Sequence, residues 1–220
     1  RVAAILLEPL QGEGGVRPGD LAYFQRIRQI CDEAGILLIL DEVQAGMGRT
    51  GTYWGYENLG IEPDVFTSAK GLGGGIPIGA LLCKEFCNVF VPGDHASTFG
   101  GNPFACGVAL SVCHTLESEN LLDNVRLRGE QLRSGLKSIA ADYPHLIADV
   151  RGWGLINGIE LHADSNINAA DVVKAAMASG LLLVPAGMTV VRFVPPLIVT
   201  AEEIDRALQA MQEVLRSMGR

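Results

Sequence analysis

Two short apolar runs in this sequence each lead into a side chain that can carry chemistry. Residues 36–40 (ILLIL) are followed at once by Asp41, and residues 64–67 (DVFT) are followed three positions later by Lys70. Short apolar runs of this kind are typical of strands buried in a parallel sheet. Because open α/β sheets bind ligands at the carboxyl ends of their strands, the sequence predicts a site that contains a carboxylate and a lysine.

The first half of the chain alternates strand-like and helix-like segments. Asp20 can cap a helix whose apolar residues recur at helical spacing and which ends at Gly35. Such alternation predicts an α/β domain built on a mixed or parallel sheet. The expected strands cover residues 2–7, 36–40, 64–67 and 77–83, with glycine-rich loops at 11–15, 46–55 and 71–75 and a helix from Pro103 to about Leu116.

The pattern changes in the second half, where strands and helices are shorter. We expect residues 1–117 to be part of a large α/β domain and residues 118–220 to form a smaller α+β domain. The expected elements of the second half are a polar helix over 121–140, a glycine-bent strand over 150–161, a helix over 169–179, short strands at 181–184 and 190–194, and an amphipathic helix over 201–217.

Charge and cysteine content argue against several classes of partner. The 220 residues carry a formal net charge of −8 and no basic run, so we expect neither nucleic acid nor a membrane as a partner. No charge-free apolar run approaches the roughly 20 residues that cross a bilayer. The five cysteines are odd in number and lack zinc-ligand spacing, so we expect reduced cysteines, no metal site and a cytoplasmic location.

The chain opens inside a predicted strand. Its first residues, Arg1-Val2-Ala3-Ala4, include no initiator methionine, and no leader sequence follows. We therefore expect a fragment of a longer protein.

Lys70 is the candidate nucleophile. A lysine is most often a solvated surface charge. Lys70 differs because it follows an apolar strand and because its small neighbours Ala69 and Gly71 leave room for a flat ring. Desolvation lowers the pKa of a lysine and frees its amine to attack an aldehyde.

Asp41 supplies the complementary group. An acid at a strand end can simply face water, but a buried carboxylate can keep a pyridine nitrogen protonated, which makes the ring an electron sink. Together with Lys70 it suits pyridoxal 5′-phosphate as the cofactor. Val43 could then pack on the ring and Gln44 could bond its phenolic oxygen, while Glu42 would point away.

A glycine motif offers an alternative. Residues 46–51 (GMGRTG) match G-x-G-x-x-G, which would favour a nicotinamide dinucleotide and an oxidoreductase. However, residues 41–45 separate the motif from the strand, and residues 52–55 do not open a helix that could bind a pyrophosphate. We therefore disfavour the dinucleotide interpretation.

Four motifs, in this order, resemble the class III (ornithine-type) aminotransferases. They are residues 8–15 (EPLQGEGG), 41–51 (DEVQAGMGRTG), 69–80 (AKGLGGGIPIGA) and 97–103 (STFGGNP). The lysine loop and the last motif most resemble the acetylornithine branch of the family. Family chains are much longer, so the resemblance implies that this chain is the C-terminal half or more of such an enzyme, inactive by itself.

The resemblance implies a fold-type-I transferase that binds pyridoxal phosphate and forms a homodimer with shared sites. By the same resemblance, Lys70 attaches the cofactor and shuttles a proton, and Asp41 binds the pyridine nitrogen. Val43 and Gln44 contact the ring, and Thr98 binds the cofactor phosphate of the neighbouring subunit. Ser97 belongs to the substrate site.

The implied reaction transfers an amino group from N-acetylornithine to 2-oxoglutarate. The products are N-acetylglutamate 5-semialdehyde and glutamate, and the step belongs to arginine synthesis. Other members of the family use succinylornithine, ornithine or 4-aminobutyrate, and these donors stay open as alternatives. A non-catalytic fragment is a further alternative.

Glu13 and Arg192 form a second candidate group. Arg192 lies among apolar residues, and an unpaired buried charge is too costly to persist. In the relatives a glutamate and an arginine at these motif positions pair, and the pair opens so that the arginine can bind the α-carboxylate of glutamate or 2-oxoglutarate. A bidentate arginine–carboxylate bond suits that role. A static structural pair is the alternative.

Overall fold

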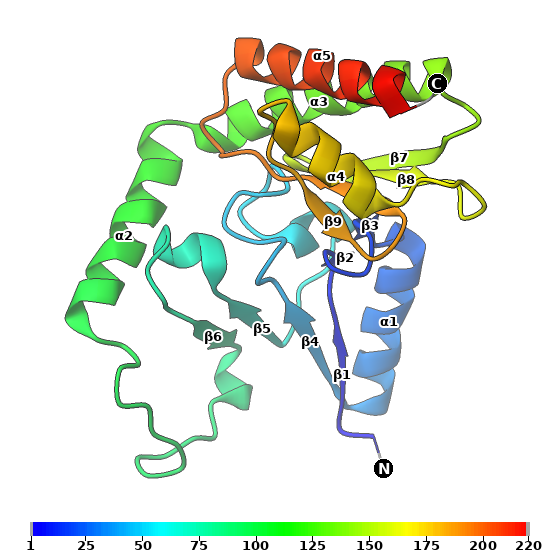
Figure 1. The fold of residues 1–220 in the computed structure, drawn as a ribbon. Coiled ribbons are helices and arrows are strands. Elements are labelled where there is room, and N and C mark those ends of the chain that lie inside the picture. The colour runs from blue at the N-terminus through cyan, green and yellow to red at the C-terminus, as the bar shows by residue number, and fades with distance from the viewer. Residues whose placement is uncertain (1, 219–220) are drawn as a thin grey trace. The chain divides into compact units, whose positions relative to one another are not determined.

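The computed structural model describes residues 2–218, which group into two compact units. Of the described residues, 2–10, 19–48 and 52–121 form unit 1, and 11–18, 49–51 and 122–218 form unit 2. The chain therefore moves from one unit to the other several times. Figure 1 shows the elements of both units in chain order.

Unit 1 is built on a four-stranded mixed sheet. Its strands are ordered β1 (Ala4–Leu7), β4 (Leu37–Asp41), β5 (Val65–Ser68) and β6 (Ala80–Cys83). The first three run parallel, as the alternation of elements predicted, and β6 runs antiparallel to β5 (Figure 1). The difference follows from the connection between β5 and β6, which holds only a single short turn of helix, because a parallel strand needs a longer crossover.

Helix α1 (Leu21–Ala34) lies against β4 and has the two ends that the sequence predicts. The Asp20 carboxylate accepts a hydrogen bond from the N–H of Tyr23 at 2.7 Å, which satisfies one free donor of the first turn. Gly35 ends the helix in a left-handed conformation with φ of 62°. Phe24 and Cys31 are the fully buried residues of this helix.

The remaining elements of unit 1 are short helices and one long one. The segment predicted as a loop at 71–75 is partly a 3₁₀ turn. Helix α2 begins with Pro103, and the Asn102 side chain caps it by accepting from the N–H of Ala105 at 3.0 Å. The elements are η1 (Gly55–Leu59), η2 (Lys70–Gly73), η3 (Glu85–Cys87) and α2 (Pro103–Ser118).

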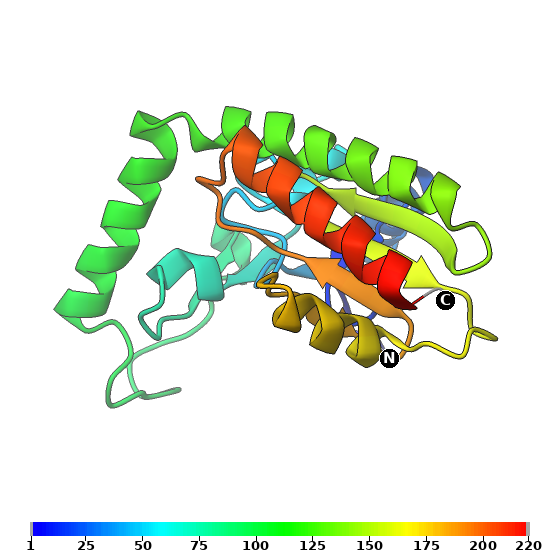
Figure 2. The ribbon, with the colours of Figure 1, turned by 45° about the horizontal axis from the view of Figure 1, so that its top comes forward.

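Unit 2 is an antiparallel sheet with helices on one face. Figure 2 shows α5 lying beside α3 along the sheet. Ile159 and Val191 of the sheet are fully buried in one cluster with Leu136 of α3, Val172 of α4 and Met211 of α5. The strands are ordered β7 (Ile147–Trp153), β8 (Ile156–Leu161), β10 (Val190–Phe193) and β9 (Val184–Ala186), and the helices are α3 (Leu121–Asp142), α4 (Ala169–Ala178) and α5 (Ala201–Met218).

The single glycine-bent strand predicted at 150–161 is wrong. The segment is a hairpin of β7 and β8, and the chain turns at Gly154, where φ is 48°. A Cβ atom at Gly154 would lie 2.5 Å from the carbonyl carbon of Thr50. The turn therefore needs glycine both for its left-handed backbone and for the close approach of another backbone segment.

The loop predicted at 11–15 is confirmed at residues 12–15, where it joins the two short strands of a ribbon. The ribbon pairs β2 (Leu10–Gln11) with β3 (Arg17–Pro18), and residues 11–18 belong to unit 2. Glu13 lies at the tip of this ribbon, between the two strands.

Candidate active site

Asp41 is the last residue of β4, and hydrogen bonds orient one of its two carboxylate oxygens. Its Oδ1 accepts hydrogen bonds from the N–H of Val43 at 2.9 Å and from the hydroxyl of Thr67 at 3.3 Å. Thr67 lies directly opposite Asp41 on the neighbouring parallel strand. Within residues 2–218, Oδ2 has no hydrogen-bond partner. The carboxylate is thus oriented by two donors and keeps one oxygen for a ligand.

Lys70 lies two residues beyond the end of β5 and has an unusual backbone. Its φ is 44°, in the left-handed region, and it begins the η2 turn. For a residue with a side chain this conformation costs about 1–2 kcal/mol. Such strain persists only where the surrounding structure holds it, and it concentrates at functional sites. The Lys70 side chain is exposed rather than packed into the core.

The loops that follow β4 and β5 pack against each other. A Cβ atom at Gly71 would lie 3.2 Å from the Cβ of Met47. Met47 is buried and also has a positive φ, of 53°. Because β4 and β5 are parallel neighbours, their carboxyl ends meet at one edge of the sheet. The structure therefore brings Asp41 and the Lys70 segment to the same edge.

The remaining candidates are two residues expected on the cofactor ring and two expected at the cofactor phosphate or the substrate. Val43 and Gln44 are half-buried beside Asp41. Ser97 and Thr98 lie in an exposed segment, where the Ser97 hydroxyl accepts from the N–H of Gly100 at 3.0 Å. No hydrogen bond joins either of these two residues to Asp41 or Lys70 in the described part of the chain.

Glu42, the residue that directly follows β4, has a specific structural role. It is 1% exposed, and its two oxygens accept from the N–H groups of Gly55 and Tyr56, each at 2.8 Å. Burial raises the pKa of this carboxyl to about 7, although the two N–H donors act in the opposite direction. Glu42 thereby ties the end of the glycine-rich loop back to β4.

The G-x-G-x-x-G segment does not form a dinucleotide site. The 3₁₀ helix η1 that follows it has only five residues. Within the segment, the Arg49 guanidinium donates to the carbonyl oxygens of Leu155 at 3.0 Å and Pro195 at 2.5 Å. Burial lowers its pKa to about 10. The motif therefore contains a structural arginine. Arg49 binds the turn of the β7–β8 hairpin and the segment that follows β10, both in unit 2.

Glu13 and Arg192 form an ion pair within unit 2. Arg192 lies in β10, opposite Gly158 of β8 and Val184 of β9, and is 6% exposed. Its Nη1 lies 2.8 Å from Oε1 of Glu13. The Glu13 side chain is 69% exposed, in contrast to the buried Arg192.

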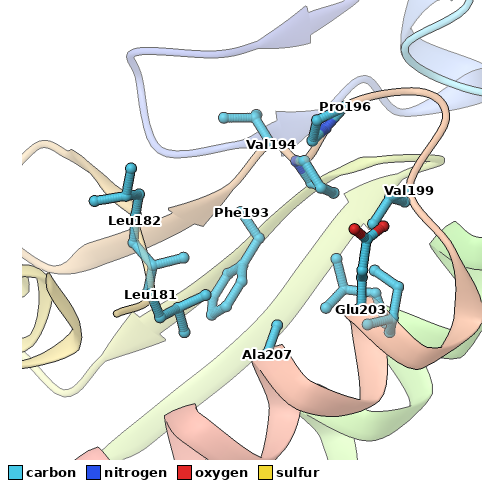
Figure 3. A pocket seen from close by; sticks show the side chains of 12 residues that line it. Leu181, Leu182, Phe193, Val194, Pro196, Val199, Glu203 and Ala207 are labelled. Carbon is cyan, nitrogen blue, oxygen red and sulfur yellow. The ribbon is translucent and has the colours of Figure 1, made fainter. Parts of the chain in front are cut away.

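An apolar pocket of about 400 Å³ lies elsewhere in unit 2 (Figure 3). Its lining includes Leu181, Leu182, Phe193, Val199 and Ala207. The acid at its rim, Glu203, accepts from the N–H of Thr200 at 2.8 Å and so caps α5. A pocket without converging polar groups is a poor candidate for catalysis.

No three histidine, cysteine, aspartate or glutamate side chains gather to form a metal site within residues 2–218. Over the same residues, no helix combines the length and the apolar character that crossing a membrane requires.

Comparison with known proteins identifies the family. The family model for class III aminotransferases matches residues 1–215. The chain therefore belongs to the class III aminotransferases, whose cofactor is pyridoxal phosphate, and it has their fold-type-I architecture.

Similar proteins with curated names are acetylornithine aminotransferases. The protein from Nostoc sp. is 72% identical over 218 residues, covering 99% of this chain and 51% of the relative. The protein from Thermosynechococcus vestitus is 73% identical over 219 residues, covering 100% of this chain and 53% of the relative. The chain thus spans about half the length of the curated relatives that it matches.

Solved structures agree with the fold. The ornithine aminotransferase of Toxoplasma gondii superposes with a TM-score of 0.92 at 36% identity, covering 98% of this chain and 52% of that one. The N-acetylornithine aminotransferase of Stenotrophomonas maltophilia gives 0.87 at 39% identity, covering 99% and 57%.

The raised pKa of Glu42 predicts a pH-dependent stability. The folded protein keeps this carboxyl protonated up to about pH 7, whereas the unfolded chain loses the proton near 4.5. The resulting stabilisation is complete below pH 4.5 and is lost as the pH rises to 7. We expect the free energy of unfolding of the whole protein, measured with denaturant from pH 4.5 to 8, to fall by up to about 3 kcal/mol more than that of Glu42→Gln. The glutamine of this variant does not titrate. Parallel curves for the two proteins would contradict this.

Proposed function

We propose that the protein carrying this chain transfers the amino group of N-acetylornithine to 2-oxoglutarate with pyridoxal phosphate as cofactor. The products are N-acetylglutamate 5-semialdehyde and glutamate, which places the reaction in arginine synthesis, and we propose a cytoplasmic homodimer. The identity of 72–73% to proteins named acetylornithine aminotransferase supports this substrate. The observation that carries the chemistry is the oriented Asp41 carboxylate, with one free oxygen, beside the strand that leads to Lys70.

The residues of unit 1 fit the cofactor. When bound, pyridoxal phosphate supplies an aldehyde that carries the amino group and a ring that accepts electrons. Asp41 Oδ2 would accept the N–H of the pyridinium, while Val43 N–H and the Thr67 hydroxyl hold the other oxygen in place. The fixed carboxylate keeps the proton on the ring nitrogen because an anion close by stabilises the cation. Val43 and Gln44 would contact the ring.

Lys70 has two tasks in this proposal. Its Nζ would hold the cofactor through the aldehyde group. The same nitrogen would also serve as the base and acid that carries a proton at the substrate carbon. The Lys70 side chain is exposed, so its Nζ is accessible to a ligand.

The remaining roles involve the second subunit and the substrate. Thr98 would bind the cofactor phosphate of the neighbouring subunit, and Ser97 would lie at the substrate site. Both residues lie in an exposed segment, which supports a contact with a neighbouring subunit. Arg192 would bind the α-carboxylate of glutamate or 2-oxoglutarate after Glu13 moves aside, and a dicarboxylate would compete with Glu13 for the guanidinium.

We also propose that residues 1–117 belong to the large domain of the enzyme and residues 118–220 to its small domain. The four-stranded mixed sheet lies within the first of these ranges, and the four-stranded antiparallel sheet lies within the second.

The substrate proposal is tested by comparing amino donors. With the whole protein, cofactor and 2-oxoglutarate, we expect kcat/KM for N-acetylornithine to exceed that for ornithine and for 4-aminobutyrate by about tenfold or more, since a site that binds an acyl group loses affinity when the group is missing. Succinylornithine is assayed alongside. A preference for free ornithine would overturn the assignment of donor and keep the family.

The role of Lys70 is tested by trapping. Reduction of the loaded protein with borohydride should leave the cofactor covalently on the peptide that contains Lys70, as peptide mapping would show. Lys70→Ala should prevent this and lower turnover by about a thousandfold or more, because both nucleophile and proton carrier are lost. Lys174→Ala, at an exposed position of α4, is the matched control and should react as the unsubstituted protein does.

The Thr67 hydroxyl should affect cofactor binding through its hydrogen bond to Asp41. Thr67→Val keeps the shape and removes one of the two donors to Asp41. We expect cofactor affinity, measured by equilibrium dialysis, to fall by about two- to tenfold, the equivalent of one hydrogen bond. The pH at which the bound cofactor changes its absorbance should shift as well. Thr67→Ser restores the donor and should reverse both effects; equal behaviour of the two variants would show that the hydroxyl has no such role.

A further inference from the structure

The two members of the Glu13–Arg192 pair are held in different ways. Arg192 lies in the middle of the sheet, with a side chain that is 8% exposed and strands paired on both sides of its own. Glu13 lies at the tip of the β2–β3 ribbon, and its side chain is 69% exposed. If the pair opens, the group with room to move is the Glu13 side chain.

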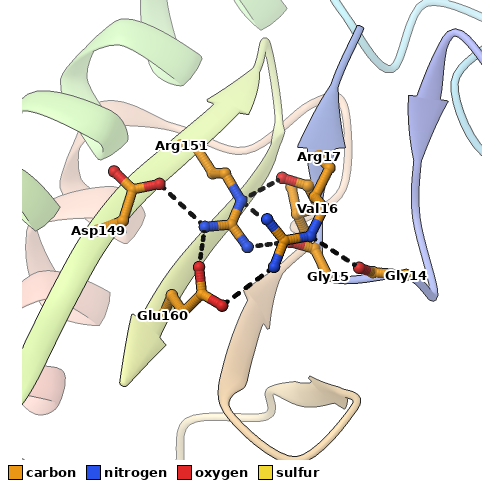
Figure 4. Close-up of polar contacts among 7 residues, drawn as sticks. All are labelled: Gly14, Gly15, Val16, Arg17, Asp149, Arg151 and Glu160. Carbon is orange, nitrogen blue, oxygen red and sulfur yellow. Dashed lines mark hydrogen bonds and ion pairs between the residues drawn. The ribbon is translucent and has the colours of Figure 1, made fainter. Parts of the chain in front are cut away.

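Arg151 of β7 holds the backbone of the loop that carries Glu13. Figure 4 shows its guanidinium directed at the carbonyl oxygens that follow the ribbon tip. Nε donates to the oxygens of Gly15 at 3.1 Å and Val16 at 2.9 Å, and Nη2 donates to Gly15 at 2.6 Å. Three hydrogen bonds from one side chain thus fix the peptide groups that follow Gly15 and Val16, two and three residues beyond Glu13.

Two carboxylates hold Arg151 in turn. Its Nη1 bonds to Asp149 at 2.9 Å and to Glu160 of β8 at 2.5 Å, and Arg17 bonds to the other oxygen of Glu160 at 3.1 Å. Burial acts to lower the pKa of Arg151, but the bonds to Asp149 and Glu160 outweigh it and the pKa is raised. The guanidinium therefore stays charged, and one network joins β7, β8 and the ribbon.

The loop backbone would not hold this shape without such support. Val16 is fully buried and has a φ of 50°, a left-handed conformation that is unfavourable for a β-branched residue. It packs closely over the sheet, because a Cβ atom at Gly158 would lie 3.1 Å from the Cβ of Val16. The bonds from Arg151 to Gly15 and Val16 supply the constraint that keeps this strained loop across Arg192.

We propose that Arg151 is a positioning residue for the Glu13–Arg192 pair. It fixes the backbone on which Glu13 stands, so that the carboxylate rests on Arg192 in the absence of a dicarboxylate and leaves it by side-chain rotation alone. Arg151 does not touch the substrate in this proposal; it sets how much of the time Arg192 is covered. This inference rests on the substrate role proposed for the pair above.

The test compares the two half-reactions of the loaded whole protein. Apparent affinity for a ligand is reduced by the fraction of sites that are closed to it. Arg151→Met frees the loop, so KM for 2-oxoglutarate should fall, and KM for N-acetylornithine should rise because Arg192 is left without its counter-charge. We expect the ratio of the two KM values to change by about threefold or more. Arg151→Lys should recover part of the change.

Two further variants keep the test decisive. Glu160→Gln weakens the hold on Arg151 without removing its bonds to the loop, so it should shift the ratio in the same direction by less, and it replaces Arg151→Met if that variant does not fold. Arg206→Met removes an arginine that is 74% exposed and lies 3.9 Å from Glu203, far from the ribbon in sequence, and should leave the ratio unchanged.

Glu13→Gln distinguishes the positioning role of Arg151 from the substrate role of the Glu13–Arg192 pair. If Glu13→Gln shifts the ratio while Arg151→Met and Glu160→Gln do not, the positioning role is overturned and the proposed function stands. If none of the three shifts it, the substrate role of the pair fails and the positioning role with it. If Arg206→Met shifts the ratio equally, the effect is general destabilisation, and the inference is also overturned.

Discussion

The parallel pairing of β4 with β5 is the constraint on which the arrangement of unit 1 depends. It sets Thr67 opposite Asp41 and sends both following loops out of the same edge of the sheet. Hydrogen bonding along the two strands thus determines both where the Asp41 carboxylate lies and where the segment that carries Lys70 leaves the sheet. The Asp41 side chain needs only two local donors to be oriented, because the strands have already placed it.

Strained backbone recurs where the protein presents functional groups. Among the described residues, four non-glycine residues have positive φ: Lys70 in the lysine turn, Met47 in the loop packed against it, Val16 three residues after Glu13, and Asn120 between α2 and α3. Each such residue costs about 1–2 kcal/mol, so the surroundings must compensate. Met47 and Val16 are buried, and Val16 is also held by Arg151, so packing and hydrogen bonds provide the compensation. The loops are therefore shaped in advance of any ligand.

Local patterns in the sequence predicted most elements, because caps and apolar periodicity act over a few residues. Asp20, Gly35 and Pro103 mark helix ends as expected, and the strands that precede Asp41 and Lys70 are present. The hairpin at Gly154 was missed because a glycine inside an apolar run fits a bent strand as well as a turn. The Glu13–Arg192 contact spans 179 positions, and the bonds from Arg151 to the ribbon span about 135, so no local signal could reveal the partners. The backbone partners of Glu42 lie in a loop whose path depends on the whole unit, so the sequence did not reveal them.

Both outer strands of the sheet in unit 1 expose apolar side chains. β1 and β6 are the outer strands of their sheet, and Leu6, Leu81 and Leu82 on them are 64%, 58% and 37% exposed. An outer strand with apolar side chains offers unpaired N–H and C=O groups to any other extended chain that meets it. Within residues 2–218, the sheet of unit 1 is therefore open to extension by a further strand at both of its edges.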